Sequence, residues 1–182
     1  YGSLLRGRST NDEWAAMQDH LNLLKMVKAD VFVFADVSGS IQGDQSRKLS
    51  TRPNMDDEEF FEYCKKIGIL CFSTPFDETA VDFLEELNVP AYKIASFELT
   101  DLELIKKVAS TGKPLIFSSG MGSIEELGLA IRTARESGCN EICILKCTSS
   151  YPASVSDSNI LTLPDMQKRF SCQVGLSDHT LG

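Results

Sequence analysis

The sequence predicts an α/β fold of the TIM-barrel type, a repeat of β/α units that is incomplete or rearranged. Short runs of β-branched and aromatic residues alternate with helical patterns, which indicates parallel strands joined by right-handed crossovers. A cluster of hydroxyl residues follows each of the last five runs. One site fed by many strand-to-helix loops is typical of a barrel, whereas an open sheet concentrates its ligands at a switch point. Six runs, rather than the eight strands of a closed barrel, predict an incomplete one.

The first predicted strand is a continuous run of β-branched and aromatic residues, of the kind that parallel sheets bury on both faces, and the other five are mostly apolar. The first, at residues 31–35, is followed by a long polar stretch that reaches Pro53. The others are four or five residues long, and each is followed directly by Ser or Cys. They lie at residues 69–72, 91–95, 114–117, 142–146 and 173–176.

The helices between these strands are predicted from apolar residues at helical spacing and from their end signals. Asp56 is expected to cap a helix that stops at Gly68, and Asp77 to open the next. A short helix is expected near Pro164. Three capping boxes mark further helix starts, at Thr10–Glu13, Thr100–Glu103 and Ser123–Glu126.

Composition limits the function classes. A length of 182 residues is ordinary for one domain, and we expect a single β/α domain over 1–182. The net charge of -8 and the pI near 4.8 argue against a nucleic-acid partner or an anionic membrane surface. No apolar run approaches the ~20 residues that span a bilayer, and no signal-peptide order begins the chain. Six scattered cysteines lack C-x-x-C pairs, so we expect reduced thiols and a cytoplasmic protein.

Two residues stand out as candidates for chemistry. Lys93 lies inside an apolar strand, where a lysine is costly unless it is paired or functional, so we interpret it as functional. His179 follows the last strand directly, in the order Ser177, Asp178, His179. Asp178 is interpreted as a loop-holding residue, and Ser123 as a helix cap only.

From about residue 58 to 182, the chain resembles the sialic acid synthase family, and within it the pseudaminic acid synthases. Five motifs in the same order carry the resemblance. They are Phe72-Ser73-Thr74-Pro75-Phe76-Asp77, Tyr92-Lys93-Ile94-Ala95-Ser96, Ser118-Ser119-Gly120-Met121, Lys146-Cys147-Thr148-Ser149-Ser150-Tyr151-Pro152 and Gly175-Leu176-Ser177-Asp178-His179-Thr180.

Residues 1–54 resemble a different barrel enzyme, an internal segment of inosose dehydratase. The join falls near residues 54–58. Two segments that resemble two barrel families lead us to interpret the chain as a chimera.

The resemblance to the synthases implies a reaction. Phosphoenolpyruvate attacks the aldehyde of an acetamido sugar through its C3, water adds at C2, and phosphate leaves. A divalent metal, Mn²⁺ or Mg²⁺, polarises the aldehyde. The family's site residues map onto this chain as follows: His179 as metal ligand; Lys93, Ser96, Ser118 and Ser177 as phosphoenolpyruvate contacts; Thr74, Ser149 and Tyr151 lining the site, with Lys93 and Tyr151 as its catalytic residues.

The chain also departs from the family pattern. Family members commonly carry Asn where this chain has Ser149, and a second metal-binding histidine is missing from the synthase-like region. The resemblance also implies an acidic residue and a lysine on the first two strands and a C-terminal domain that completes the site from a partner subunit, and we expect residues 58–182 to lack these parts of the site. We therefore expect metal to be held weakly and part of the site to be lacking.

Two alternatives remain open. Lys93 could form a Schiff base with a carbonyl substrate, which would make the protein an aldolase. A chimeric or fragment barrel could also be a non-catalytic scaffold. In every case the open sheet edges predict self-association into a homo-oligomer.

Overall fold

The computed structural model describes residues 32–35 and 57–181. Its centre is one parallel sheet of six strands, whose order in space follows their order in sequence. An open doubly wound sheet would reverse that order at a switch point, so the sequential order confirms the barrel-type repeat. The strands are β1 (Phe32–Ala35), β2 (Leu70–Ser73), β3 (Tyr92–Ile94), β4 (Leu115–Ser118), β5 (Ile142–Cys147) and β6 (Gln173–Ser177).

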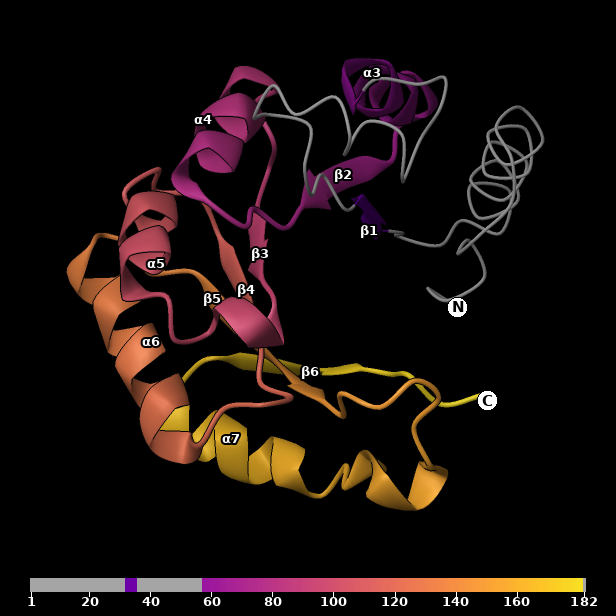
Figure 1. The fold of residues 1–182 in the computed structure, drawn as a ribbon, viewed down its shortest axis with the longest axis vertical. Helices are drawn as coiled ribbons and strands as arrows, with labels where there is room; N and C mark the ends of the chain where they lie inside the picture. Colours follow the sequence, from indigo (N-terminus) through magenta and orange to yellow (C-terminus); the bar gives the residue numbers. More distant parts are fainter. Residues whose placement is uncertain (1–31, 36–56, 182) are drawn as a thin grey trace.

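The helices lie in an arc along one face of this sheet (Figure 1). This follows from right-handed crossovers repeated in one direction, which place every connecting helix on the same side. Two short 3-10 helices, η1 (Ser96–Glu98) and η2 (Val155–Ser158), were not predicted. The α-helices are α3 (Asp57–Ile67), α4 (Glu78–Glu86), α5 (Leu102–Ala109), α6 (Ile124–Glu136) and α7 (Thr162–Phe170).

Helix ends agree with the sequence at most of the described positions. The Asp77 side chain accepts a hydrogen bond from the Ala80 N–H at 2.9 Å, and Ser123 with Glu126 forms a complete capping box. The box expected at Thr100 is wrong. Asp101 is the N-cap of α5 instead, because Thr100 is taken up in the turn that follows η1. The Thr10 box and the expected cap at Asp56 lie outside the described residues.

Strand register divides the sheet into two faces. One cross-strand row is fully buried beneath the helices, and the next row, pointing the other way, is half-buried. The buried row is Ile94, Phe117 and Ile144; the half-buried row is Lys93, Ile116 and Cys143. Since side chains alternate between faces, Lys93, Ser118, Cys147 and Ser177 all project to the inner face, away from the helices.

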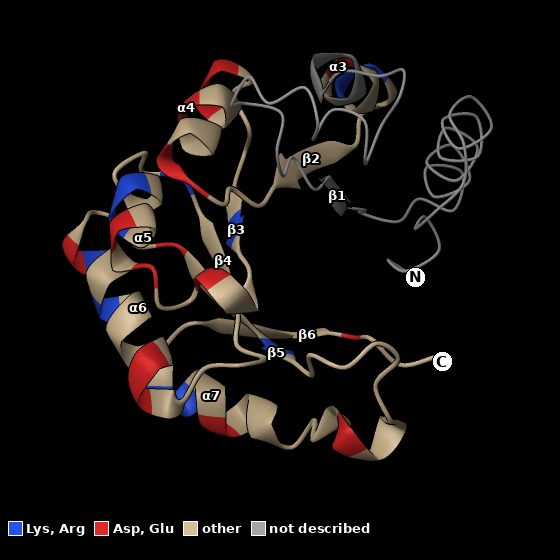
Figure 2. Cartoon of the chain, in the orientation of Figure 1, with Lys and Arg blue, Asp and Glu red and all other residues tan. Residues whose placement is uncertain are grey.

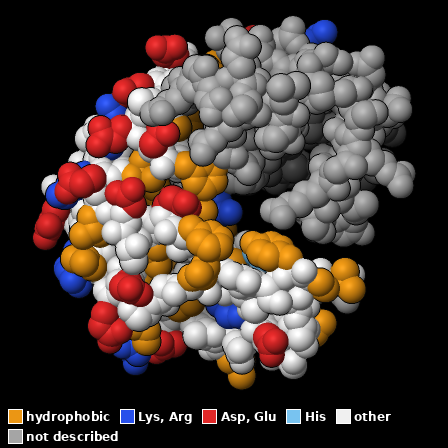
Figure 3. Space-filling model, viewed as in Figure 1, with side chains coloured by type: hydrophobic (Ala, Val, Ile, Leu, Met, Phe, Trp, Pro, Cys, Tyr) orange, Lys and Arg blue, Asp and Glu red, His pale blue; other side chains and the backbone are white. Residues whose placement is uncertain are grey.

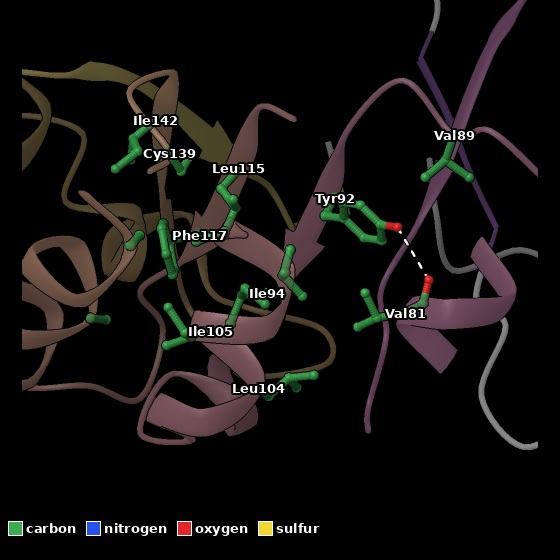
Figure 4. Packing of buried hydrophobic residues seen from close by; sticks show 14 of the residues in the cluster. Val81, Val89, Tyr92, Ile94, Leu104, Ile105, Leu115, Phe117, Cys139 and Ile142 are labelled. Carbon is green, nitrogen blue, oxygen red and sulfur yellow. Dashed lines mark hydrogen bonds between the residues drawn. The ribbon is translucent and has the colours of Figure 1, made fainter. Parts of the chain in front are cut away.

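The core fills the space between the sheet and its helices (Figure 4). Tyr92 is fully buried there, and its hydroxyl donates to Glu85 Oε1 at 2.7 Å and approaches the Val81 carbonyl at 3.3 Å. Lys113 Nζ lies 2.6 Å from the same Glu85 oxygen. This network joins α4, β3 and the loop before β4, so it fixes the outer side of the strand that carries Lys93.

Most of the charged residues of the described part lie in the helices and loops rather than in the strands (Figure 2). Among the helices of residues 57–181, none combines the length and hydropathy that a membrane crossing needs. All six cysteines fall within the described residues and are free thiols, as expected.

Candidate active site at the carboxyl ends of the strands

The predicted site residues meet in one small cavity at the carboxyl ends of β3 to β6. Its volume is about 70 Å³. Every predicted site residue except Thr74 lines it, although these residues come from four different strand ends. The lining consists of Lys93, Ala95, Ser96, Phe97, Ser118, Cys147, Ser149, Tyr151, Ser177 and His179.

Lys93 brings the positive charge to this cavity. It lies at the centre of β3, between the fully buried Tyr92 and Ile94, and the strand's alternation turns its side chain to the opposite, inner face. In Figure 2, part of β3 has the colour of Lys and Arg. Lys146 in β5 differs, because its Nζ contacts Thr148 Oγ1 at 2.6 Å and the Asp157 carbonyl at 2.9 Å. Lys146 therefore stabilises the loop after β5 and does not line the cavity.

Two buried hydroxyl groups have no hydrogen-bond partner within the described part of the chain. They are Ser118 Oγ, at the end of β4, and Thr74 Oγ1, directly after β2. Ser118 is 3% exposed and Thr74 2%. A buried hydroxyl without a partner costs free energy, and in native proteins such a group is explained by strain, by a catalytic role or by a bound water or ion. Ser118 lines the cavity, whereas Thr74 lies outside its lining.

Ser96 and Gly120 are joined by a hydrogen bond across the cavity wall. The Gly120 N–H donates to Ser96 Oγ at 3.0 Å. Ser96 therefore accepts from the backbone, and its own O–H remains available to donate to a further acceptor. Ser119 differs from its neighbours, since its hydroxyl donates to the Leu145 carbonyl at 3.1 Å.

His179 is oriented by the backbone of the β5 loop. Its Nδ1 lies 2.9 Å from the Thr148 carbonyl oxygen. A carbonyl can only accept, so we assign the proton to Nδ1, which leaves the lone pair on Nε2. Ser177 Oγ lies 3.5 Å from that Nε2. A histidine held through Nδ1 and open at Nε2 is the usual arrangement of a metal ligand.

The described residues contain no complete set of metal ligands. Among them, no group of three or more His, Cys, Asp or Glu side chains is placed to hold an ion. Asp178 turns back to its own loop, where it accepts from Thr180 N at 3.0 Å, and that backbone hydrogen bond lowers the pKa of the Asp178 carboxyl. Asp178 therefore holds the loop, as the sequence suggested.

Tyr151 covers His179. The two ring centroids are 4.3 Å apart and tilted by 34°, and Tyr151 is 63% exposed. The Ala153 N–H donates to the His179 carbonyl at 2.9 Å, which ties the β5 loop to the β6 loop. Phe97 and Met121 are also exposed, and Figure 3 shows hydrophobic side chains gathered over the η1 region of the surface. The cavity thus has a polar floor and an apolar rim.

Sequence reasoning missed four residues of this site, namely Ala95 and Phe97 in its lining and two residues of its polar wall, Cys147 and Gly120. Cys147 lines the cavity, with its Sγ 3.9 Å from His179 Nδ1. Gly120 lies among Ser96, Cys147 and Ser149. The motifs contained Cys147 and Gly120, but only the register of β5 and the fold of the β4 loop show which way they face.

A larger cavity of about 660 Å³ lies at the opposite, amino ends of β4 to β6. Its lining includes Asn140, Glu141 and Gln167 but no lysine, arginine or histidine. It lacks the cation and the clustered hydroxyls of the smaller cavity, and active sites of β/α barrels lie at the carboxyl ends of the strands. The smaller cavity is therefore the candidate active site.

Comparison with known proteins decides the family. The family model described as the NeuB family matches residues 21–182. The chain belongs to the NeuB family. The match begins within the segment that we assigned to another family, and the chimeric origin of that segment stays a prediction.

Named relatives agree with this membership. The pseudaminic acid synthase of Helicobacter pylori is 46% identical over 124 residues, a stretch that covers 68% of this chain and 36% of that protein. The crystal structure of a spore coat polysaccharide biosynthesis protein from Bacillus subtilis matches with a TM-score of 0.78 and 30% identity, over 90% of this chain and 48% of that one.

The sialic acid synthetase of Leptospira borgpetersenii, solved in complex with citrate, matches with a TM-score of 0.76 and 27% identity. That match covers 91% of this chain and 60% of that one. This NeuB-family chain thus spans little more than a third of the Helicobacter pylori relative's length.

Proposed function

We propose that this chain carries the phosphoenolpyruvate-binding part of a synthase that condenses phosphoenolpyruvate with an acetamido-sugar aldehyde to give a nonulosonic acid. The supporting observation is the cavity itself, which gathers Lys93 with hydroxyls from the ends of separate strands. Pseudaminic acid is the product that we favour, because the Helicobacter pylori relative bears that name.

The donor set suits a small dianion. A lysine ammonium and several hydroxyls offer positive charge and hydrogen bonds to phosphate and carboxylate oxygens, and charge-assisted bonds of this kind are the stronger ones. Ser118 would gain through a bound anion the acceptor that it lacks in the described residues. Thr74 does not line the cavity, so we do not count its hydroxyl among these anion donors.

The volume of the cavity indicates which part of the substrates can bind in it. About 70 Å³ is far below the roughly 300–1,000 Å³ of pockets that bury a whole ligand. We assign it to the phosphate or carboxylate end of phosphoenolpyruvate. The sugar would lie beyond it, over the apolar rim beside Tyr151.

The proposed reaction forms one carbon–carbon bond and releases phosphate. C3 of phosphoenolpyruvate attacks the aldehyde carbon, water adds at C2, and the phosphate leaves with its bridging oxygen. Within this scheme Lys93 and the serines bind and orient the anion, and Tyr151 lines the path to the aldehyde. When bound, a divalent metal would supply Lewis acidity at that aldehyde.

Mn²⁺ or Mg²⁺ would use Nε2 of His179. A single nitrogen is one ligand of a normal set, so we propose that the described residues hold the metal weakly. The phosphoenolpyruvate contacts do not depend on it.

Calorimetric titration of the 182-residue chain with phosphoenolpyruvate tests the proposal, with Lys93→Met as the paired variant. We expect the unaltered chain to bind and the variant to lose at least about tenfold in affinity, since a charge-assisted contact is removed. Equal affinities, or no binding by the unaltered chain, would contradict the proposal.

A Schiff-base aldolase is the second candidate, because Lys93 is an amine on the wall of a cavity. Borohydride reduction with pyruvate present would trap a covalent adduct on Lys93 in an aldolase. Our proposal predicts no adduct in the same experiment. Absence of both trapping and phosphoenolpyruvate binding would favour the non-catalytic scaffold.

We further propose that the protein is cytoplasmic and self-associates. Six free thiols support a reducing compartment. Among the described strands, β1 and β6 each have a neighbour on one side only, and such edges favour pairing with a second copy. A monomer by light scattering at high concentration would count against self-association.

A further inference from the structure

Gly120 lies where a side chain would enter the wall of the candidate site. An ideal Cβ built on it would overlap Ser149 Oγ. It would also lie 3.0 Å from both Cys147 Sγ and Ser96 Oγ, closer than ordinary van der Waals contact. All three of these side chains line the cavity.

Space, not backbone conformation, disfavours a side chain here, because Ser149 Oγ would have to move to admit a Cβ. Gly112 and Gly138 have φ values of 74° and 104°, in the left-handed region that favours glycine, and a Cβ on either would meet nothing within 4 Å. Gly120 is the reverse case, since its φ lies outside that region and its neighbours are close. An alanine could adopt this backbone, but its methyl group would need room that Ser149, Cys147 and Ser96 occupy.

The backbone of Gly120 also sets the direction of a hydroxyl. Its N–H donates to Ser96 Oγ at 3.0 Å, which fills an acceptor position of that oxygen. The Ser96 proton is then directed to a different acceptor, and the cavity that Ser96 lines is where an anion oxygen would lie. A methyl group on Gly120 would push against the oxygen that its own N–H holds in place.

We propose that Gly120 is a positioning residue of the anion site. Because Gly120 has no side chain, Ser149, Cys147 and Ser96 can all pack against its backbone. Its N–H donates to Ser96 Oγ, which leaves the Ser96 O–H to donate to the anion. This inference rests on the proposed phosphoenolpyruvate site, whose ligand is the anion concerned. Gly120 itself acts through Ser96 and Ser149.

Replacing Gly120 with alanine should therefore weaken the binding of phosphoenolpyruvate. We expect at least a tenfold loss in affinity, because the added methyl overpacks a small, closely walled cavity. Gly128→Ala is the matched control. A Cβ there lies 3.5 Å from Arg132 Nη1 and 3.6 Å from Phe170 Cε1, which are ordinary contacts. It lies in helix α6, so this control should keep full affinity and raise the midpoint of thermal unfolding.

A rescue experiment separates positioning from folding. Ser149→Ala removes the oxygen that the new methyl would overlap, so Gly120→Ala should cost several-fold less affinity in that background than in the unaltered chain. If Gly120→Ala lowered only the stability of the fold, its effect on affinity would not depend on whether Ser149 is present. If Gly120→Ala alone unfolds, the double variant is compared with Ser149→Ala: affinities within several-fold of each other support the inference, and a folded double variant that binds at least tenfold more weakly contradicts it.

The experiment is a calorimetric double-mutant cycle with phosphoenolpyruvate on Gly120→Ala, Ser149→Ala and their combination. Affinity coupling between the two sites supports the inference. Equal affinities of Gly120→Ala and the unaltered chain, or additive losses, overturn it and leave the proposed function standing. No binding by the unaltered chain overturns both.

Discussion

Removing the Ser118 hydroxyl should change stability and binding in opposite directions. Ser118 Oγ is buried and has no hydrogen-bond partner among the described residues. An unpartnered buried hydroxyl costs about 1–3 kcal/mol, and its removal leaves only a small void. We therefore expect Ser118→Ala to raise the free energy of unfolding by about 1 kcal/mol. For a chain of this length, that corresponds to a rise of about 2–4 °C in the midpoint of thermal unfolding.

Binding of phosphoenolpyruvate should weaken in the same variant. A hydrogen bond to a charged group contributes about 1.5–3 kcal/mol, so the dissociation constant should rise about 10- to 150-fold. Thermal unfolding followed by circular dichroism and calorimetric titration measure the two effects on one sample.

The adjacent serine is the matched control. Ser119 donates its hydroxyl to the Leu145 carbonyl at 3.1 Å, so Ser119→Ala should lower the unfolding free energy by about 0.5–1.5 kcal/mol. Its affinity for phosphoenolpyruvate should not change. A Ser118→Ala variant that is less stable than the unaltered chain, or that binds equally well, would refute the assignment of this hydroxyl to the ligand.

Three further predictions concern the fold and the metal. Asp77→Ala removes the cap of α4 and should cost about 0.5–2 kcal/mol in urea denaturation, and no loss would contradict the cap. Burial alone would raise the pKa of Glu85, but hydrogen bonds from Lys113 and Tyr92 outweigh it, so the pKa lies below its ordinary value. The stability from this group is therefore complete above about pH 4.3, the ordinary pKa, and is lost as the pH falls through the lowered value. Lys113→Met should flatten that acid loss in pH-dependent urea melts, and an unchanged pH profile would refute the linkage. Finally, paramagnetic relaxation by Mn²⁺ should be weak in the unaltered chain and disappear in His179→Ala; equal relaxation would place the ion elsewhere.

The fold was largely predictable because each strand is a mostly apolar run followed by polar residues. The expected strands differ from the observed ones by a residue or two at their ends. The strands also lie side by side in the order of the sequence, as expected for a barrel and not for an open sheet with a switch point. The start of α5 was misplaced because Thr100 and Asp101 are both good caps. Only the hydrogen bonds of the preceding turn select Asp101.

The site was predictable in part. Motifs at strand ends identified most of the residues that line the cavity, since parallel strands bring their carboxyl ends together. Motifs could not show that Thr74 lies outside that lining. They also could not show that Gly120 is enclosed by three side chains from two other segments, or that the Thr148 carbonyl orients His179. These facts depend on contacts between distant segments, which local sequence does not encode.

The most direct test of the account is amide chemical-shift mapping of the ¹⁵N-labelled chain during titration with phosphoenolpyruvate. We predict saturable shifts confined to the carboxyl ends of β3 to β6, at residues 93–97, 118–120, 147–151 and 177–179. Shifts around the larger cavity at the amino ends, near Asn140 and Gln173, or no saturable shifts at all, would contradict the assignment of the anion site.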